Sequence, residues 1–287
     1  MFQGIITALV TPFKNDQVDF ESVETLVLSQ LADGVDGFVI NGTTGESPNL
    51  NLDEIKEYVR RARKIVGPNF PIIVGTGSNS THKTIEFNRA LKDEAIDAYL
   101  VVVPYYNKPP QRGLLTHFTE IANQSDKPII LYDIPSRSVV ELEVETVVEL
   151  AKHENIVGIK DGTGNLKKIK DLAPRVDGQF SLLSGDDISC IEFIALGGHG
   201  VISVCSHIIG PQMKKILGAD PSSWKSLWNG YNELFNQLYC EPNPIPVKKA
   251  LQLQAKINLA EVRLPLVEML SENAARLQEE MKKLNLM

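Results

Sequence analysis

Asn155-Ile156-Val157-Gly158-Ile159-Lys160-Asp161 is an apolar run that a lysine ends and that polar residues bound on both sides. Short apolar runs between polar residues are typical of strands buried on both faces, which occur in parallel α/β sheets. Side chains alternate along a strand, so Gly158 and Lys160 share one face and Val157 and Ile159 the other. The stretch therefore predicts a buried strand with an amine at its carboxyl end.

Seven further β-rich runs lie along the chain, and segments of helical period separate them. Together the eight runs occupy residues 5–10, 37–40, 71–75, 98–103, 128–132, 156–160, 180–184 and 200–203. Asn51 followed by Glu54 predicts a capping box that opens a helix ending at Gly67. Eight strands that alternate with helices favour a (β/α)8 TIM barrel. A doubly wound sheet is less favoured, because no Gly-x-Gly-x-x-Gly turn follows any of the eight runs.

The pattern becomes purely helical in the last quarter of the chain, with predicted helices at residues 222–240, 247–260 and 267–284. The proline-rich stretch Glu241-Pro242-Asn243-Pro244-Ile245-Pro246 separates the first two of these helices. We therefore expect two domains, a barrel catalytic domain at residues 1–221 and a small C-terminal helical domain at residues 222–287.

Composition and charge restrict the classes of partner. The 287 residues are 43% hydrophobic and 23% charged, with a formal net charge of −7 and no basic tail, so we expect small-molecule substrates and neither nucleic acid nor a membrane. The odd number of three cysteines indicates reduced thiols. The amino terminus lacks the regions of a signal peptide, and we therefore expect a cytoplasmic protein.

Polar residues just after the strands are the candidates for chemistry, because barrels of this kind place their active sites there. An amine among apolar walls has a lowered pKa, since desolvation disfavours its charged form, and Lys160 is therefore a candidate Schiff-base nucleophile. The alternative is a lysine that merely ends its strand and reaches water. Tyr132 lies two residues after Ile130 and so points to the same inward face of its strand, which predicts that its phenol lies near Lys160. The alternative is a tyrosine that only packs in the barrel wall.

Two loops carry candidate carboxylate-binding groups. Gly42-Thr43-Thr44-Gly45 follows the second run, where backbone N–H and hydroxyl groups in a tight turn suit a small anion; an ordinary loop with locally bonded hydroxyls is the alternative. Arg137 follows the fifth run and is a candidate for two-pronged carboxylate binding, or else an ordinary surface ion pair.

A metal centre is not expected, and no cofactor is required. Asp186 and Asp187 follow the seventh run, but they more simply cap a helix that begins near Ile188. No two histidines have the spacing of metal ligands; they are His82, His117, His153, His199 and His207. This disfavours a metal-dependent aldolase and favours the Schiff-base lysine.

Five motifs together resemble those of the dihydrodipicolinate synthase (4-hydroxy-tetrahydrodipicolinate synthase) family, in the same order and spacing. They are Gly42-Thr43-Thr44-Gly45-Glu46, Pro104-Tyr105-Tyr106-Asn107, Tyr132-Asp133-Ile134-Pro135-Ser136-Arg137, Gly158-Ile159-Lys160-Asp161 and Leu183-Ser184-Gly185-Asp186-Asp187. The resemblance covers essentially the whole chain, including the proline-rich stretch. It implies a class I pyruvate-dependent lyase on a TIM barrel.

The resemblance also implies a reaction. Lys160 is expected to form an imine with pyruvate, and the derived enamine attacks the aldehyde of L-aspartate-4-semialdehyde. Cyclisation and release then give 4-hydroxy-tetrahydrodipicolinate, an intermediate of diaminopimelate and lysine biosynthesis.

Residue roles follow from the same resemblance. A proton relay is implied for Thr43, Tyr132 and Tyr106, with Tyr106 supplied by a neighbouring subunit of a homotetramer. The implied substrate-binding groups are Thr44 for the pyruvate carboxylate, Arg137 for the semialdehyde carboxylate, and the backbone carbonyls of Gly185 and Ile202.

The chain departs from the family pattern in two places. Asp133 stands where many relatives have asparagine, which places an extra carboxylate beside Tyr132 and Arg137. Lysine-inhibited relatives carry two histidines and a glutamate where this chain has Leu52, Ile55 and Lys83. A cationic Lys83 repels the ammonium groups of lysine, so we expect weak or absent inhibition.

Two other functions fit part of the same pattern. Another pyruvate-dependent aldolase, of the N-acetylneuraminate lyase or keto-deoxy-sugar-acid type, keeps the lysine and tyrosine but accepts a different aldehyde. A non-catalytic barrel that binds a keto acid has no need of a buried nucleophile, so Lys160 together with Tyr132, Tyr106 and Thr43 argues for catalysis.

Overall fold

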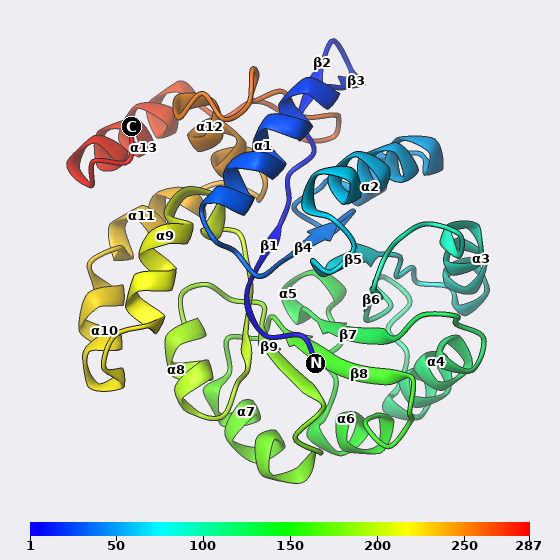
Figure 1. Ribbon diagram of the computed structural model, residues 1–287. Helices are drawn as coiled ribbons and strands as arrows, with labels where there is room; N and C mark the ends of the chain where they lie inside the picture. Colours follow the sequence, from blue (N-terminus) through cyan, green and yellow to red (C-terminus); the bar gives the residue numbers. More distant parts are fainter. The chain divides into compact units, whose positions relative to one another are not determined.

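The computed structural model describes every residue from Met1 to Met287. Eight parallel strands form a closed barrel in the order β1-β10-β9-β8-β7-β6-β5-β4, and helices alternate with them along the chain (Figure 1). The predicted (β/α)8 barrel is confirmed. Its strands are β1 (Gly4–Ala8), β4 (Gly37–Ile40), β5 (Ile72–Gly75), β6 (Ala98–Val102), β7 (Ile129–Asp133), β8 (Ile156–Asp161), β9 (Ser181–Ser184) and β10 (Gly200–Ser203).

The strand ends follow the sequence prediction closely. Each of the eight predicted runs overlaps one strand, and β1 differs most, because it ends at Ala8 instead of residue 10. Every residue of β4, β7 and β10 is buried, as expected for strands that are covered on both faces.

A small hairpin was missed by the sequence analysis. Strands β2 (Phe13–Lys14) and β3 (Gln17–Val18) pair antiparallel around Asn15 and Asp16, whose φ angles are 54° and 62°. Two consecutive residues with positive φ match the twist of a tight hairpin, and Asn and Asp tolerate that conformation. Strands of two residues are too short to show a period.

Helices follow the barrel strands along the chain, and the α2 start agrees with its predicted local signal. They are α1 (Phe20–Ala32), α2 (Leu52–Val66), α3 (Thr81–Leu91), α4 (Gln111–Asn123), α5 (Pro135–Ser138), α6 (Val144–Leu150), α7 (Leu166–Leu172), α8 (Cys190–Ala195) and α9 (Ser206–Leu217). The predicted capping box opens α2: the Asn51 side chain accepts from the Glu54 N–H, and the Glu54 carboxylate accepts from the Asn51 N–H, each at 3.0 Å.

The C-terminal helices are shorter than predicted. They are α10 (Pro221–Asn229), α11 (Asn232–Leu238), α12 (Ile245–Leu253) and α13 (Ser271–Lys283). Helix α12 ends before Ala255, which has a φ of 54°, and the segment up to α13 contains Pro265. Leu264 and Val267, two apolar residues of this segment, are 80% and 59% exposed. The domain boundary at residue 221 stays a prediction.

Contacts group the chain into two compact units, Met1–Ile6 with Pro71–Ile202 and Thr7–Phe70 with Ser203–Met287. In the first unit β7 pairs with β6 and with β8, and α4, α6 and α7 lie along the outer side of these strands (Figure 1). The second unit contains β4, the β2–β3 hairpin, α1, α2 and the helices from α9 to α13.

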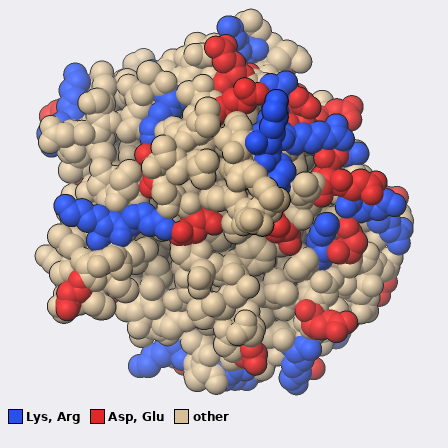
Figure 2. Space-filling view, in the orientation of Figure 1, with Lys and Arg blue, Asp and Glu red and all other residues tan.

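Charged side chains of both signs are interspersed on the face that Figure 2 shows. None of the helices combines the length and the apolar character that crossing a membrane requires.

Candidate active site

The pairing of β7 with β8 places Tyr132 directly opposite Lys160. Both residues are buried, with 6% and 7% of their surface exposed, and the Lys160 Nζ lies 4.1 Å from the centroid of the Tyr132 ring. The next residues, Asp133 and Asp161, also face each other in register and project to the opposite face of the sheet. Asp133 contacts Lys168 of the outer helix α7, so Tyr132 and Lys160 project into the barrel.

Gly185 lies directly against the Lys160 side chain. It follows β9, and its N–H donates to the carbonyl of Asp161 at 2.6 Å. A Cβ atom at this position would lie 2.9 Å from Lys160 Cε and 3.0 Å from Cγ, well inside van der Waals contact. A glycine at position 185 therefore gives the lysine side chain its room.

Three further predicted site residues of the first unit lie in different settings. Arg137 is exposed on the short helix α5, and Ile202 is buried in β10. Tyr106 is 88% exposed and has a φ of 76°, a strained conformation for a bulky residue. The described contacts link none of the three to Lys160.

In the second unit, Thr43 and Thr44 lie in a closed turn after β4. The N–H of Glu46 donates to the Thr43 carbonyl at 3.1 Å. The two residues that flank the turn, Asn41 and Glu46, have φ angles of 58° and 59°. Asparagine tolerates this left-handed conformation, but it costs free energy in Glu46, so contacts around Glu46 must hold the turn.

The C-terminal segment supplies these contacts. The Thr44 hydroxyl accepts from Asn243 Nδ2 at 2.9 Å. Glu46 forms a fully buried ion pair with Lys248, with 2.5 Å between Oε1 and Nζ, and its other oxygen accepts from the Arg263 N–H at 3.0 Å. Burial lowers the pKa of Lys248 to about 8, although the Glu46 charge acts to raise it.

Sequence reasoning missed the Glu46–Lys248 pair. The two residues are 202 positions apart, and neither has a local signal that names its partner. A lysine in an otherwise apolar stretch, as in Pro244-Ile245-Pro246-Val247-Lys248, was the only available hint of a buried ammonium group.

Asp133 does not lie beside Tyr132 as expected, because strand alternation turns its carboxylate toward the outer helices. Its Oδ2 accepts from the Leu142 N–H at 3.1 Å and contacts the Lys168 ammonium. Burial raises the pKa of Asp133 to about 6, and the Lys168 charge acts against this rise.

Residues 1–284 match the dihydrodipicolinate synthetase family. The chain belongs to this family. It is similar to a 4-hydroxy-tetrahydrodipicolinate synthase of Bdellovibrio bacteriovorus, with 50% identity over all of this chain and 99% of the relative. The resemblance inferred from the five motifs is therefore confirmed.

Solved structures of the family have the same fold. One is a chloride-inhibited dihydrodipicolinate synthase from Acinetobacter baumannii complexed with pyruvate, with 39% identity, a TM-score of 0.95 and full coverage of both chains. Another is a dihydrodipicolinate synthase from Cyanidioschyzon merolae with lysine bound, with 38% identity and a TM-score of 0.95 over 100% of this chain and 99% of that one.

Replacing Lys248 tests the buried pair. Lys248→Met leaves the Glu46 carboxylate buried without its partner, and we expect the free energy of unfolding to fall by about 3–5 kcal/mol in urea denaturation. The charge-neutral control, Glu46→Gln with Lys248→Met, should recover most of this loss. A single variant as stable as the wild type would show that the pair does not stabilise the second unit.

Proposed function

We propose that this chain is a 4-hydroxy-tetrahydrodipicolinate synthase, a lyase that condenses pyruvate with L-aspartate-4-semialdehyde through a Schiff base on Lys160. The observation that carries the proposal is the buried Lys160 amine next to the Tyr132 ring, in a chain that belongs to the dihydrodipicolinate synthetase family. The reaction belongs to diaminopimelate and lysine biosynthesis.

Lys160 acts as the nucleophile. Its neutral amine attacks the keto carbon of pyruvate, and loss of water gives an imine that, once protonated, withdraws electrons from the neighbouring methyl carbon. Loss of a methyl proton gives an enamine, and this carbon attacks the aldehyde of the semialdehyde. The face of the Tyr132 ring, 4.1 Å from Nζ, favours a positive charge at the position of the protonated imine.

Proton transfer is assigned to Tyr132, Thr43 and Tyr106. Tyr132 is the member of this relay that contacts the Lys160 side chain. The exposed ring of Tyr106 is available to a second copy of the chain. We therefore assign Tyr106 to the active site of a neighbouring subunit, within a homotetramer.

Substrate binding is assigned by carboxylate chemistry. Thr44 and its backbone N–H hold the carboxylate of pyruvate, and the carbonyls of Gly185 and Ile202 line the pocket. Arg137 holds the carboxylate of the semialdehyde through two parallel hydrogen bonds. Its exposed guanidinium forms no ion pair within this chain, which leaves it available for a substrate.

The choice of aldehyde tests the function. Purified protein is given pyruvate with aspartate semialdehyde, N-acetylmannosamine or glyceraldehyde, and pyruvate consumption is measured. We expect consumption with the semialdehyde and not with the other two. Consumption with a sugar acceptor alone would indicate a different pyruvate aldolase, and binding of pyruvate without consumption or covalent capture would indicate a keto-acid-binding barrel.

Replacing Arg137 tests its assignment. Arg137→Ala removes the charged hydrogen bonds to the semialdehyde, so we expect its KM to rise at least about tenfold. Trapping of the pyruvate imine with borohydride should be unchanged, and Arg175→Ala, at another exposed arginine of the same unit, serves as the control. Full activity of Arg137→Ala would remove Arg137 from the site.

Lysine is expected to inhibit weakly or not at all. Lys83 presents an exposed ammonium group on α3, and Ile55 is buried within α2, with 2% of its surface exposed, where inhibited relatives have a polar side chain. Initial rates with and without low-millimolar lysine measure this. Inhibition in that range would contradict the expectation.

A further inference from the structure

The Asp133 carboxylate closes the loop that carries Arg137. Its Oδ2 accepts from the Leu142 N–H at 3.1 Å, so the two ends of residues 133–142 meet. Helix α5, with Arg137 near its end, lies between them. The position of the Arg137 backbone therefore depends on contacts made at the base of this loop.

Lys168 of α7 joins both ends of the loop to the helix layer. Its Nζ contacts the Asp133 carboxylate and lies 3.2 Å from Oε1 of Glu141. The Lys168 side chain is 3% exposed and that of Asp133 is fully buried, so their contact is shielded from water. Breaking a buried ion pair by removing one partner is strongly unfavourable, because the other charge is left uncompensated.

Polar contacts connect this loop to α7 and to α4. A cavity of about 550 Å³ lies beside the loop, lined by residues 139–144 and by Lys167, Lys168 and Asp171 of α7. Gln111 of α4 lines the same cavity and donates to the Glu141 carbonyl at 2.7 Å. The cluster of Asp133, Lys168 and Glu141 is thus the link from the loop to α7.

The charges of Asp133, Asp161 and Glu141 all act on the Lys168 ammonium group. Asp161 of β8 is the register partner of Asp133 and is also buried. Its Oδ1 accepts from the N–H and the hydroxyl of Thr163, and its charge acts on both Asp133 and Lys168. One oxygen of each buried carboxylate has no hydrogen-bond partner. Burial acts to lower the pKa of Lys168, but the charges of Asp133, Asp161 and Glu141 raise it above its ordinary value.

We infer that Lys168 and Asp133 are positioning residues that set the affinity for the second substrate by fixing the Arg137 loop. The inference rests on the proposed function, because it takes Arg137 to bind the carboxylate of the semialdehyde. Neither residue is assigned a chemical step, since Asp133 projects to the face opposite Tyr132 and Lys160.

The cluster also predicts a pH dependence. The charged groups that act on Asp133 are Lys168 from α7 and Asp161 from β8, and Glu141 from the loop contacts Lys168 in turn. The Asp133 pKa is raised to about 6 by burial, so its charged form, which pairs with Lys168, is present above this pH and is lost below it. The KM for the semialdehyde should therefore rise as the pH falls through about 6.

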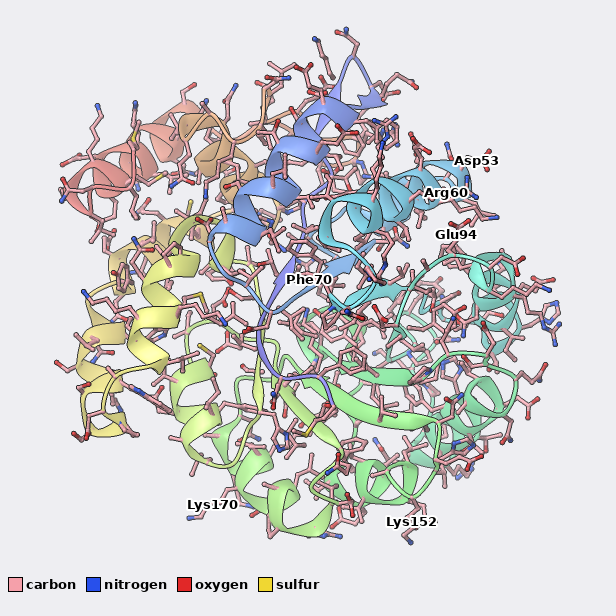
Figure 3. All side chains as sticks on the ribbon, viewed as in Figure 1. Asp53, Arg60, Phe70, Glu94, Lys152 and Lys170 are labelled. Carbon is pink, nitrogen blue, oxygen red and sulfur yellow. The ribbon has the colours of Figure 1, made fainter.

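Lys168→Met, with Lys170→Met as its matched control, tests the inference. Lys170 is on the same helix, is exposed and points away from the ribbon (Figure 3). We expect Lys168→Met to raise the KM for the semialdehyde about tenfold, with kcat and borohydride-trapped pyruvate imine within about twofold of the wild type. Lys170→Met should match the wild type. An unchanged KM in Lys168→Met, or an equal loss of imine, would overturn the inference.

Asp133→Asn provides a second test if Lys168→Met does not fold, because it removes the charge and keeps the shape. We expect its KM for the semialdehyde to be raised and constant from about pH 5 to about pH 8, since the carboxylate whose pKa lies near 6 is absent. A variant with the wild-type pH profile would overturn the inference. Failure of the proposed function is distinct, because then the wild type itself would not consume the semialdehyde.

Discussion

Side-chain alternation along two paired strands decides which side chains project into the barrel and which face the outer helices. Tyr132 and Lys160 face each other across β7 and β8 and project into the barrel, while Asp133 and Asp161, one residue further on, face the outer helices. A register shift by one residue on either strand would exchange these roles and turn the amine or the phenol outward. The register is therefore as important to the site as the residues themselves.

In each unit, a buried ion pair fixes the loop that comes after a strand. In the first unit Lys168 contacts Asp133 at the base of the loop that carries Arg137. In the second unit Lys248 contacts Glu46 in the turn that carries Thr43 and Thr44. A buried pair fixes the positions of its two partners, because separating them leaves a charge without compensation. Both candidate carboxylate-binding segments are thus attached to the rest of their unit by a buried ion pair.

Local patterns predicted much of this structure. The eight strands and the capping box of α2 follow from periods and spacings of a few residues, and the parity of Tyr132 predicted its approach to Lys160. By the same alternation, the Asp133 side chain points to the face of the sheet opposite Tyr132. The expectation of a carboxylate beside Tyr132 did not take this into account. The partners of Asp133 and Glu46 are 35 and 202 residues away, and no local pattern in one sequence identifies them.

The central claim is that Lys160 is the residue that captures pyruvate. The most direct measurement is mass spectrometry of peptides from protein that has been reduced with borohydride in the presence of pyruvate. We expect one pyruvate-derived adduct, on the peptide that contains Lys160, and none in Lys160→Arg. An adduct on another lysine, or full activity without any adduct, would contradict it.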